Sequence, residues 1–228
     1  SYVLALQFGL LPEQLRPAAV KFLVKDIRDK KKHLSTGFLG TPYLCHVLSE
    51  NGEAALAYDL LLQETYPSWL YPVKMGATTI WERWDGQKTD STFQNPGMNS
   101  FNHYAYGAIG DWMYQVAAGL RLGAPGYKRI VIEPALTDKL TYAKATYAGS
   151  YGEIASGGER SGNKITLRVT IPPNTSATIR LPRADAGGVR EGGRPLADAP
   201  GLKITSANEA RVELEAGSGM YSFEWTLK

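Results

Sequence analysis

The sequence predicts an α+β protein in which a helical part is followed by an antiparallel β-sandwich. Apolar residues recur at helical spacing through most of the first 125 residues. The pattern changes around Ala124-Pro-Gly-Tyr-Lys, and short β-branched or alternating runs follow, separated by turn-rich clusters. Short strands at this spacing are typical of a sandwich. We therefore expect two domains, residues 1–125 and residues 126–228.

Five helices are predicted in the first part. Residues 2–10 read as an apolar helix, and Glu13 to about Lys31 as an amphipathic one. Residues 41–50 and 53–64 read as two more, separated by an Asn-Gly turn. The fifth runs from Phe101 to about residue 120 and carries three glycines. Because glycine disfavours helices by about 1 kcal/mol relative to alanine, these glycines indicate close packing.

The second part reads as short strands at residues 129–133, 164–171, 176–181, 211–215 and 220–225, with a possible hairpin at 147–154. It shows no acid cluster, no metal-ligand spacing and no aromatic row. A structural role is the expectation for this part. A carbohydrate-binding surface is the alternative.

Residues 76–85 contain the strongest candidates for catalytic and ligand-binding side chains in the chain. This run places Glu82 next to Trp81 and close to Trp84, with Arg83 and Asp85 beside them. Glycoside hydrolysis uses such a set, because indole rings stack on sugar faces and a carboxylate handles protons at the anomeric carbon. On a helix, however, the two tryptophans would share one face and could simply be core. Arg83 and Asp85 could orient Glu82, bond each other or form structural salt bridges.

Residues 83–101 are polar and rich in turn residues, which predicts a long functional loop. His103 follows it, at the start of the fifth predicted helix. A neutral imidazole can both donate and accept a hydrogen bond, so His103 suits a sugar hydroxyl. The alternative is a histidine bonded to local backbone.

Four blocks in one order closely resemble bacterial α-L-rhamnosidases of the inverting glycoside hydrolase family 78 type. They are TGFLGTPYL (36–44), LLQETYPSWLYPV (61–73), GATTIWERWDG (76–86) and MNSFNHYAYGAIGDWMY (98–114). The resemblance implies an (α/α)6 barrel followed by a β-sandwich, and removal of terminal α-L-rhamnose from glycosides and plant polysaccharides. It also implies that Glu82 is the general base and that His103 contacts the bound rhamnose. Trp81 and Trp84 are further substrate-binding candidates, of which one could line the pocket while the other packs behind it.

The sequence departs from the family pattern in one large respect. Family members carry the general acid in the first half of the barrel, and that half precedes everything seen here. Five predicted helices are also too few to close a barrel of six helical hairpins. We expect the missing half of the same polypeptide to cover the inner helix faces, and this piece alone to be inactive.

Composition gives bounds but little information on identity. The net charge of +3 is small and the basic residues are scattered, which gives a nucleic-acid function little support. No stretch is long and apolar enough to span a bilayer. The single cysteine, Cys45, cannot form an internal disulfide and is expected to be a buried thiol.

Nothing in the sequence indicates a metal ion or an organic cofactor. Aglycone, linkage and compartment are left open. Two other functions also stay open, namely a different glycosidase or lyase on the same barrel and a non-catalytic carbohydrate-binding protein.

Overall fold

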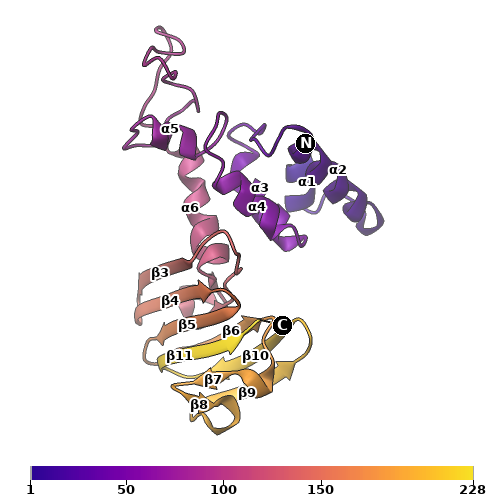
Figure 1. Ribbon diagram of the computed structural model, residues 1–228, viewed down its shortest axis with the longest axis vertical. Coiled ribbons are helices and arrows are strands. Elements are labelled where there is room, and N and C mark those ends of the chain that lie inside the picture. The colour runs from indigo at the N-terminus through magenta and orange to yellow at the C-terminus, as the bar shows by residue number, and fades with distance from the viewer. Residues whose placement is uncertain (1, 228) are drawn as a thin grey trace. The chain divides into compact units, whose positions relative to one another are not determined.

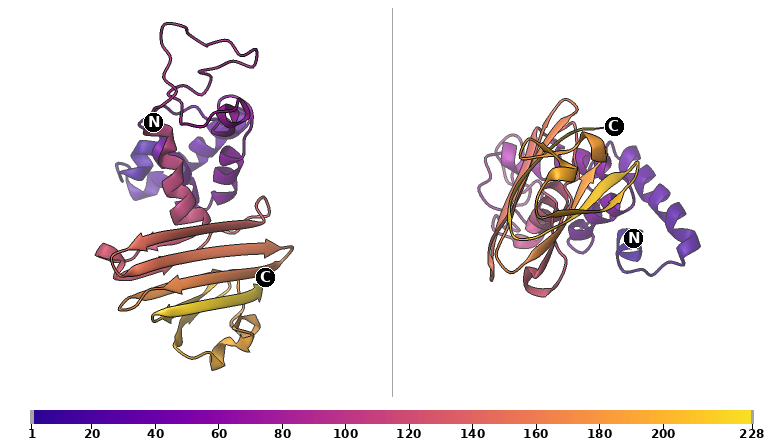
Figure 2. Two further views of the ribbon diagram at one scale, coloured as in Figure 1. Left: turned by 90° about the vertical axis from the view of Figure 1, so that its left-hand side faces the viewer. Right: turned by 90° about the horizontal axis from the view of Figure 1, so that it is seen from below.

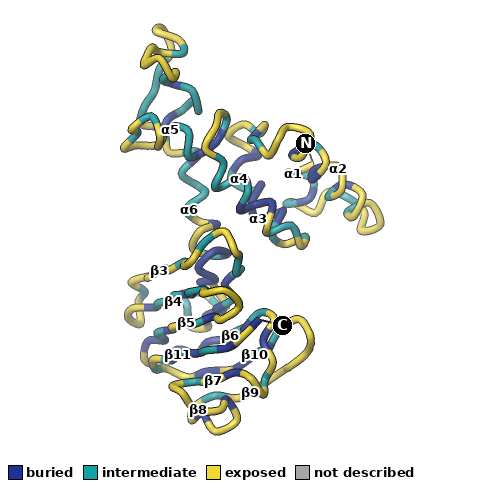
Figure 3. Tube along the Cα trace, viewed as in Figure 1, coloured by how far each residue is buried: buried dark blue, intermediate teal, exposed yellow. Residues whose placement is uncertain are grey.

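The computed structural model describes residues 2–227 and divides into two compact units (Figure 1). The helical unit ends at Trp112 and the β-unit begins at Met113. Each unit has its own set of buried residues (Figure 3). The predicted order, a helical part followed by an antiparallel β-sandwich, is confirmed.

The first helices lie close to their predicted positions. They are α1 (Tyr2–Gln7), the 3-10 turn η1 (Glu13–Leu15), α2 (Arg16–Asp29), α3 (Thr41–Glu50) and α4 (Ala54–Leu61). Helices α3 and α4 pack together, and the turn between them uses Gly52 at φ +83°, a conformation that glycine adopts without steric cost. Cys45 is buried in α3 as expected, and this burial raises the pKa of its thiol to about 12. No helix within residues 2–227 is long and apolar enough to cross a membrane.

A short helix that the sequence did not reveal, α5 (Leu70–Lys74), lies at the end of the second quoted block, residues 61–73. Ser68 stabilises its first turn, because its Oγ accepts the backbone N–H of Tyr71 at 3.1 Å. At five residues, the helix is too short to leave a periodic signal.

The single helix predicted from Phe101 to about residue 120 is wrong. The structure has instead a 3-10 helix η2 (Tyr104–Ala108), one turn of α-helix α6 (Ile109–Trp112), a π-helical turn η3 (Met113–Ala117) and strand β1 (Leu120–Leu122). The π turn is closed by the N–H of Ala118, which donates to the carbonyl of Met113 at 2.9 Å. Residues 101–103 stay outside the helix because they bond to another extended segment, and Gly119 at φ +74° ends it.

The β-unit is a two-sheet sandwich. Its remaining strands are β2 (Arg129–Ile132), β3 (Tyr142–Gly149), β4 (Gly152–Ser161), β5 (Lys164–Ile171), β6 (Ser176–Pro182), β7 (Arg190–Glu191), β8 (Arg194–Pro195), β9 (Leu202–Ala207), β10 (Arg211–Ala216) and β11 (Gly219–Thr226). One sheet has the order β1-β2-β6-β10-β9 and the other β3-β4-β5-β11-β7-β8. Neighbouring strands are antiparallel except β2 and β6, which pair in parallel. The left view of Figure 2 shows β3, β4, β5 and β11 side by side.

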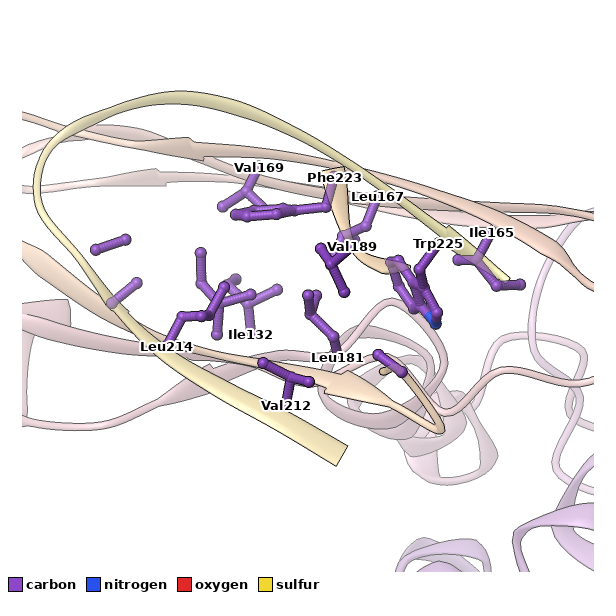
Figure 4. Close-up of a cluster of buried hydrophobic side chains, with 14 of the residues drawn as sticks. Ile132, Ile165, Leu167, Val169, Leu181, Val189, Val212, Leu214, Phe223 and Trp225 are labelled. Carbon is purple, nitrogen blue, oxygen red and sulfur yellow. The ribbon is translucent and has the colours of Figure 1, made fainter. Parts of the chain in front are cut away.

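The core of the β-unit lies between the two sheets. In Figure 4, Leu167, Val169 and Phe223 project from one sheet toward Ile132 and Leu214 of the other. Buried and exposed residues alternate along β5 because successive side chains of a strand point to opposite faces. The outward-facing residues of both sheets therefore lie outside this core.

Arginines and glutamates form an ion-pair network on the outer face of the five-stranded sheet. Glu133 accepts Arg180 at 3.0 Å and Arg211 at 3.2 Å. Glu213 accepts Arg180 Nε at 2.7 Å, and this hydrogen bond is the main cause of the lowered pKa of Glu213. The network links Glu133, the residue after β2, to β6 and β10 across the sheet.

Candidate active site

Two extended segments bring Glu82 and His103 into the same region. The N–H of Glu82 donates to Ser100 O at 3.0 Å, and the N–H of His103 donates to Ile80 O at 2.8 Å. Residues 79–82 therefore run beside residues 100–103, although neither segment is long enough to count as a strand. The pairing brings together two residues that are 21 positions apart in the sequence.

The predicted loop between these segments folds back on itself. Its sides are joined by the N–H of Lys88, which donates to Thr92 O at 2.8 Å, and by the N–H of Gln94, which donates to Gly86 O at 3.2 Å. Arg83 donates to Gln94 Oε1 at 2.7 Å. Arg83 therefore closes the loop, and no ion pair joins it to Glu82 or Asp85 within residues 2–227.

Trp81 is buried inside this loop, with only 6% of its surface exposed. Its ring meets the edge of Phe101 at 5.0 Å between centroids. Gly86 lies against both rings, and a Cβ there would come within 3.1 Å of the Phe101 ring. Trp81 thus packs among residues of its own loop.

Trp84 is only half-buried and belongs to a chain of aromatic contacts, which we call the aromatic stack. The stack consists of Trp69, Trp84, Tyr106, Phe38, His103 and Tyr104. Trp84 lies nearly parallel to Tyr106, at 3.8 Å between centroids and 18° between planes. Trp69 contacts the edge of Trp84 and donates its indole N–H to Tyr106 O at 2.9 Å. Four separate chain segments are joined in this way.

His103 lies between Phe38 and Tyr104 in the stack, at the N-cap of η2. Its ring is parallel to Phe38 at 4.8 Å. Its Nδ1 accepts the N–H of Ala105 in a long contact of 3.4 Å, so the local backbone bond considered above does form. A neutral ring that accepts at Nδ1 carries its proton on Nε2. Nε2 has no hydrogen-bond partner within the part of the chain that the structure describes.

Glu82 is half-buried and its carboxylate has no ion pair or hydrogen bond among residues 2–227. Its charge reaches the stack, because burial together with the nearby Tyr66 and Glu82 raises the pKa of the Tyr106 phenol. Asp85 acts in the same way on Tyr66 and Tyr71, whose pKa values are raised mainly by burial. Both carboxylates therefore lie near tyrosine side chains. No group of three or more metal-ligating side chains occurs in the described part of the chain.

Sequence reasoning singled out Glu82, Trp81, Trp84 and His103, and it missed Phe38, Trp69 and Tyr106. Phe38 and Trp69 lie in the first two quoted blocks, and Tyr106 lies in the fourth. These three residues therefore lay in sequence blocks that already indicated the family. Only the ring contacts distinguish them from their neighbours.

Comparison with known proteins gives matches along the chain. Residues 1–117 match the family model of the bacterial α-L-rhamnosidase 6 hairpin glycosidase domain. Residues 119–194 match that of the bacterial α-L-rhamnosidase C-terminal domain. An α-L-rhamnosidase of Formosa agariphila is 43% identical over 98% of this chain, and one of Streptomyces avermitilis is 47% identical over 80% of it.

Solved structures agree with these matches. The crystal structure of the Streptomyces avermitilis α-L-rhamnosidase complexed with L-rhamnose has a TM-score of 0.89 at 42% identity and covers 98% of this chain. The structure of the α-L-rhamnosidase from Dictyoglumus thermophilum has a TM-score of 0.86 at 35% identity and covers 99%. The chain spans only 18–25% of the length of these relatives. It belongs to the bacterial α-L-rhamnosidase family, with part of the six-hairpin glycosidase domain followed by the C-terminal domain.

Proposed function

We propose that the whole protein removes terminal α-L-rhamnosyl groups from glycosides by inversion, with Glu82 as the general base. The observation that carries this proposal is the state of Glu82. It is a half-buried carboxylate without a cationic partner, held by backbone bonds next to an aromatic stack. Such a carboxylate is free to accept a proton from water.

The proposed reaction needs two carboxyl groups. Water attacks the anomeric carbon from the face opposite the leaving group, and Glu82 takes the proton that water loses as its oxygen bonds to that carbon. The glycosidic C–O bond breaks, and a general acid protonates the departing oxygen. Inverting enzymes hold the two carboxyl groups roughly 6.5–9.5 Å apart to leave room for the water. We place the acid outside residues 1–228, as the family resemblance implies.

The other site residues have supporting roles in this proposal. The free Nε2–H of His103 is suited to donate a hydrogen bond to a sugar hydroxyl. Trp84, which is half-buried, is better exposed to a sugar than Trp81. We assign Trp84 to substrate contact and Trp81 to support of the loop that holds Glu82.

The test is the substitution Glu82→Gln in the full-length protein, which keeps the size of the side chain and removes its basicity. We expect turnover of an aryl α-L-rhamnoside to fall by about 10³-fold or more, with rhamnose binding nearly intact. NMR of the wild-type reaction should show the β-anomer released first. Glu50→Gln, at an exposed position at the end of α3, is the matched control and should leave turnover unchanged.

Turnover close to that of the wild type in Glu82→Gln would remove Glu82 from this role. Release of the α-anomer would contradict inversion. Activity on glucosides without activity on rhamnosides would favour another glycosidase of the same fold.

A further inference from the structure

The outer face of the six-stranded sheet carries a hollow that lies within the β-unit and shares no residue with the candidate active site. Its volume is about 500 Å³. Pockets for small molecules in proteins commonly measure about 300–1,000 Å³. The hollow is therefore large enough for a ligand of one or two sugar rings.

Strand register explains why the sheet is hollow at this place. One row across β3, β4, β5 and β11 consists of Thr146, Ala155, Thr170 and Met220. The adjacent outward row consists of Lys144, Gly157, Arg168 and Ser222. Side chains at these positions share one face, because outward residues alternate with buried ones along each strand. The small residues Ala155, Gly157 and Ser222 leave open space between the long ones.

The two cations beside the hollow are held by one carboxylate. Glu159, in the next outward row, accepts Lys144 at 2.8 Å and Arg168 at 2.9 Å through the same oxygen. These bonds, led by the one from Lys144, lower the pKa of Glu159, which keeps it ionised at neutral pH. The triad draws the charged ends of both long side chains toward Glu159, while the aliphatic part of Lys144 passes beside Gly157.

The lining matches a neutral, hydroxyl-rich ligand. Lys144 and Arg168 have further N–H groups to donate, and Glu191, whose Oε1 already accepts the backbone N–H of Ser222 at 3.3 Å, lines the hollow from the β7 side. The charges of Lys144 and Arg168 are balanced by those of Glu159 and Glu191, so the hollow has no excess charge to attract an ion. Ala155 and Met220 provide apolar surface, and Met220 is 84% exposed. A sugar offers the complementary surface, since its hydroxyls both donate and accept and its C–H faces are apolar.

We propose that this hollow is a second, non-catalytic carbohydrate site, which holds a neutral sugar of the glycoside on which the enzyme acts. The choice of a sugar over another neutral ligand rests on the proposed function. The position of the site is inferred only from the strand register and the residues that line the hollow. Such a site would keep the protein on a branched or polymeric substrate between cleavage events.

The experiment titrates full-length wild-type protein with an S-linked α-L-rhamnosyl disaccharide, which resists hydrolysis, and follows binding by calorimetry. The test variant is Gly157→Leu. A Cβ at this position would lie 3.4 Å from the flexible Lys144 side chain and 3.9 Å from the Arg168 carbonyl oxygen, which are ordinary contacts, and we expect the added leucine to fill the hollow. Thr226→Leu is the control, because Thr226 lies on the same face outside the hollow.

We expect Gly157→Leu to lose one binding event per chain relative to the wild type, and Thr226→Leu to lose none. Hydrolysis of a small aryl rhamnoside should stay within about twofold of the wild type in both variants. If Gly157→Leu does not fold, Arg168→Gln is expected to weaken the same event by about tenfold, since it removes charged donors and leaves the backbone unchanged.

Equal stoichiometry and affinity in the wild type and the variants would overturn the proposal. So would a wild type that binds the disaccharide only at a site abolished by substitutions around Glu82. The two proposals can fail separately. If Glu82→Gln kept wild-type turnover, the proposed function would fail, but the binding event that Gly157→Leu removes would still be observed.

Discussion

At the scale of single residues, Tyr106 makes contacts with three other aromatic residues of the candidate site. It is 7% exposed, stacks on Trp84, contacts Phe38 and accepts the indole N–H of Trp69 at its carbonyl oxygen. The sequence indicated Glu82 and His103 chiefly because the blocks that contain them, residues 76–86 and 98–114, resemble those of the family. Tyr106 is one of 13 tyrosines, and nothing local marks it, because its role depends on partners from distant segments.

We predict that Tyr106→Leu in the full-length protein lowers kcat by about tenfold or more, because Trp84 and the segment of Glu82 lose their support. Tyr106→Phe keeps the ring and should retain most of the activity. Steady-state kinetics on an aryl α-L-rhamnoside checks both. The exposed Tyr151→Leu serves as the control, and a Tyr106→Leu variant as active as that control would show that the stack does not position the site.

At the scale of elements, the sequence predicted best where the two faces of a strand have different surroundings. Strands β5, β6, β10 and β11 were visible because buried and exposed residues alternate along them. Strand β9 was not visible, because it is an edge strand whose residues are nearly all exposed. The stretch from Phe101 to residue 120 was mistaken for one helix. Its apolar residues recur at helical spacing, but the structure has a short 3-10 helix, one turn of α-helix, a π-helical turn and the start of a strand.

Gly119 should be irreplaceable at the end of this stretch. Its φ is +74°, and a Cβ there would lie 2.2 Å from the backbone nitrogen of Pro134. We expect Gly119→Ala to lower the free energy of unfolding of the β-unit by at least about 2 kcal/mol. Gly126→Ala is the matched control, because Gly126 has φ +68° and nothing within 4 Å.

That control should cost about 1 kcal/mol, the price of a left-handed alanine alone. Urea unfolding of the three proteins measures the difference. If both substitutions lowered the free energy of unfolding equally, the backbone near Pro134 would be able to shift without an energetic penalty.

At the scale of the whole molecule, fold class and family were predictable from the sequence, because each depends on patterns that many residues share. The relation of Glu82 to the stack was not, since it depends on ring orientations and hydrogen bonds that no periodicity encodes. The hollow on the six-stranded sheet was equally hidden. It needs Gly157, Ala155 and Ser222 to be neighbours, and only the strand register shows that they are.

Stability as a function of pH is also a property of the whole fold. The pKa of Glu213 is lower in the folded protein than its ordinary value, chiefly because Arg180 donates to it. Ionised Glu213 therefore stabilises the fold above the unfolded glutamate pKa of about 4.3, and this stabilisation is lost as the pH falls through the folded value. We expect Glu213→Gln to cost about 1–2 kcal/mol at pH 7 and to show a smaller loss of stability than the wild type on acidification.

Thermal unfolding between about pH 3 and pH 7 checks this expectation. Glu215→Gln is the control, because Glu215 is exposed and reaches Lys203 only at 4.0 Å. If Glu213→Gln and the wild type lost stability in parallel as the pH fell, the acid sensitivity would lie elsewhere in the fold.

The close parallel contact of Trp84 with Tyr106 also has an optical consequence. Aromatic rings held 3.8 Å apart in a fixed chiral arrangement couple their electronic transitions, and this coupling appears as circular dichroism in the near ultraviolet. Of the five tryptophans, only Trp225 lies in the β-unit. The candidate site therefore contributes to an intrinsic near-ultraviolet signal of the helical unit, which can be recorded without labels or substrate.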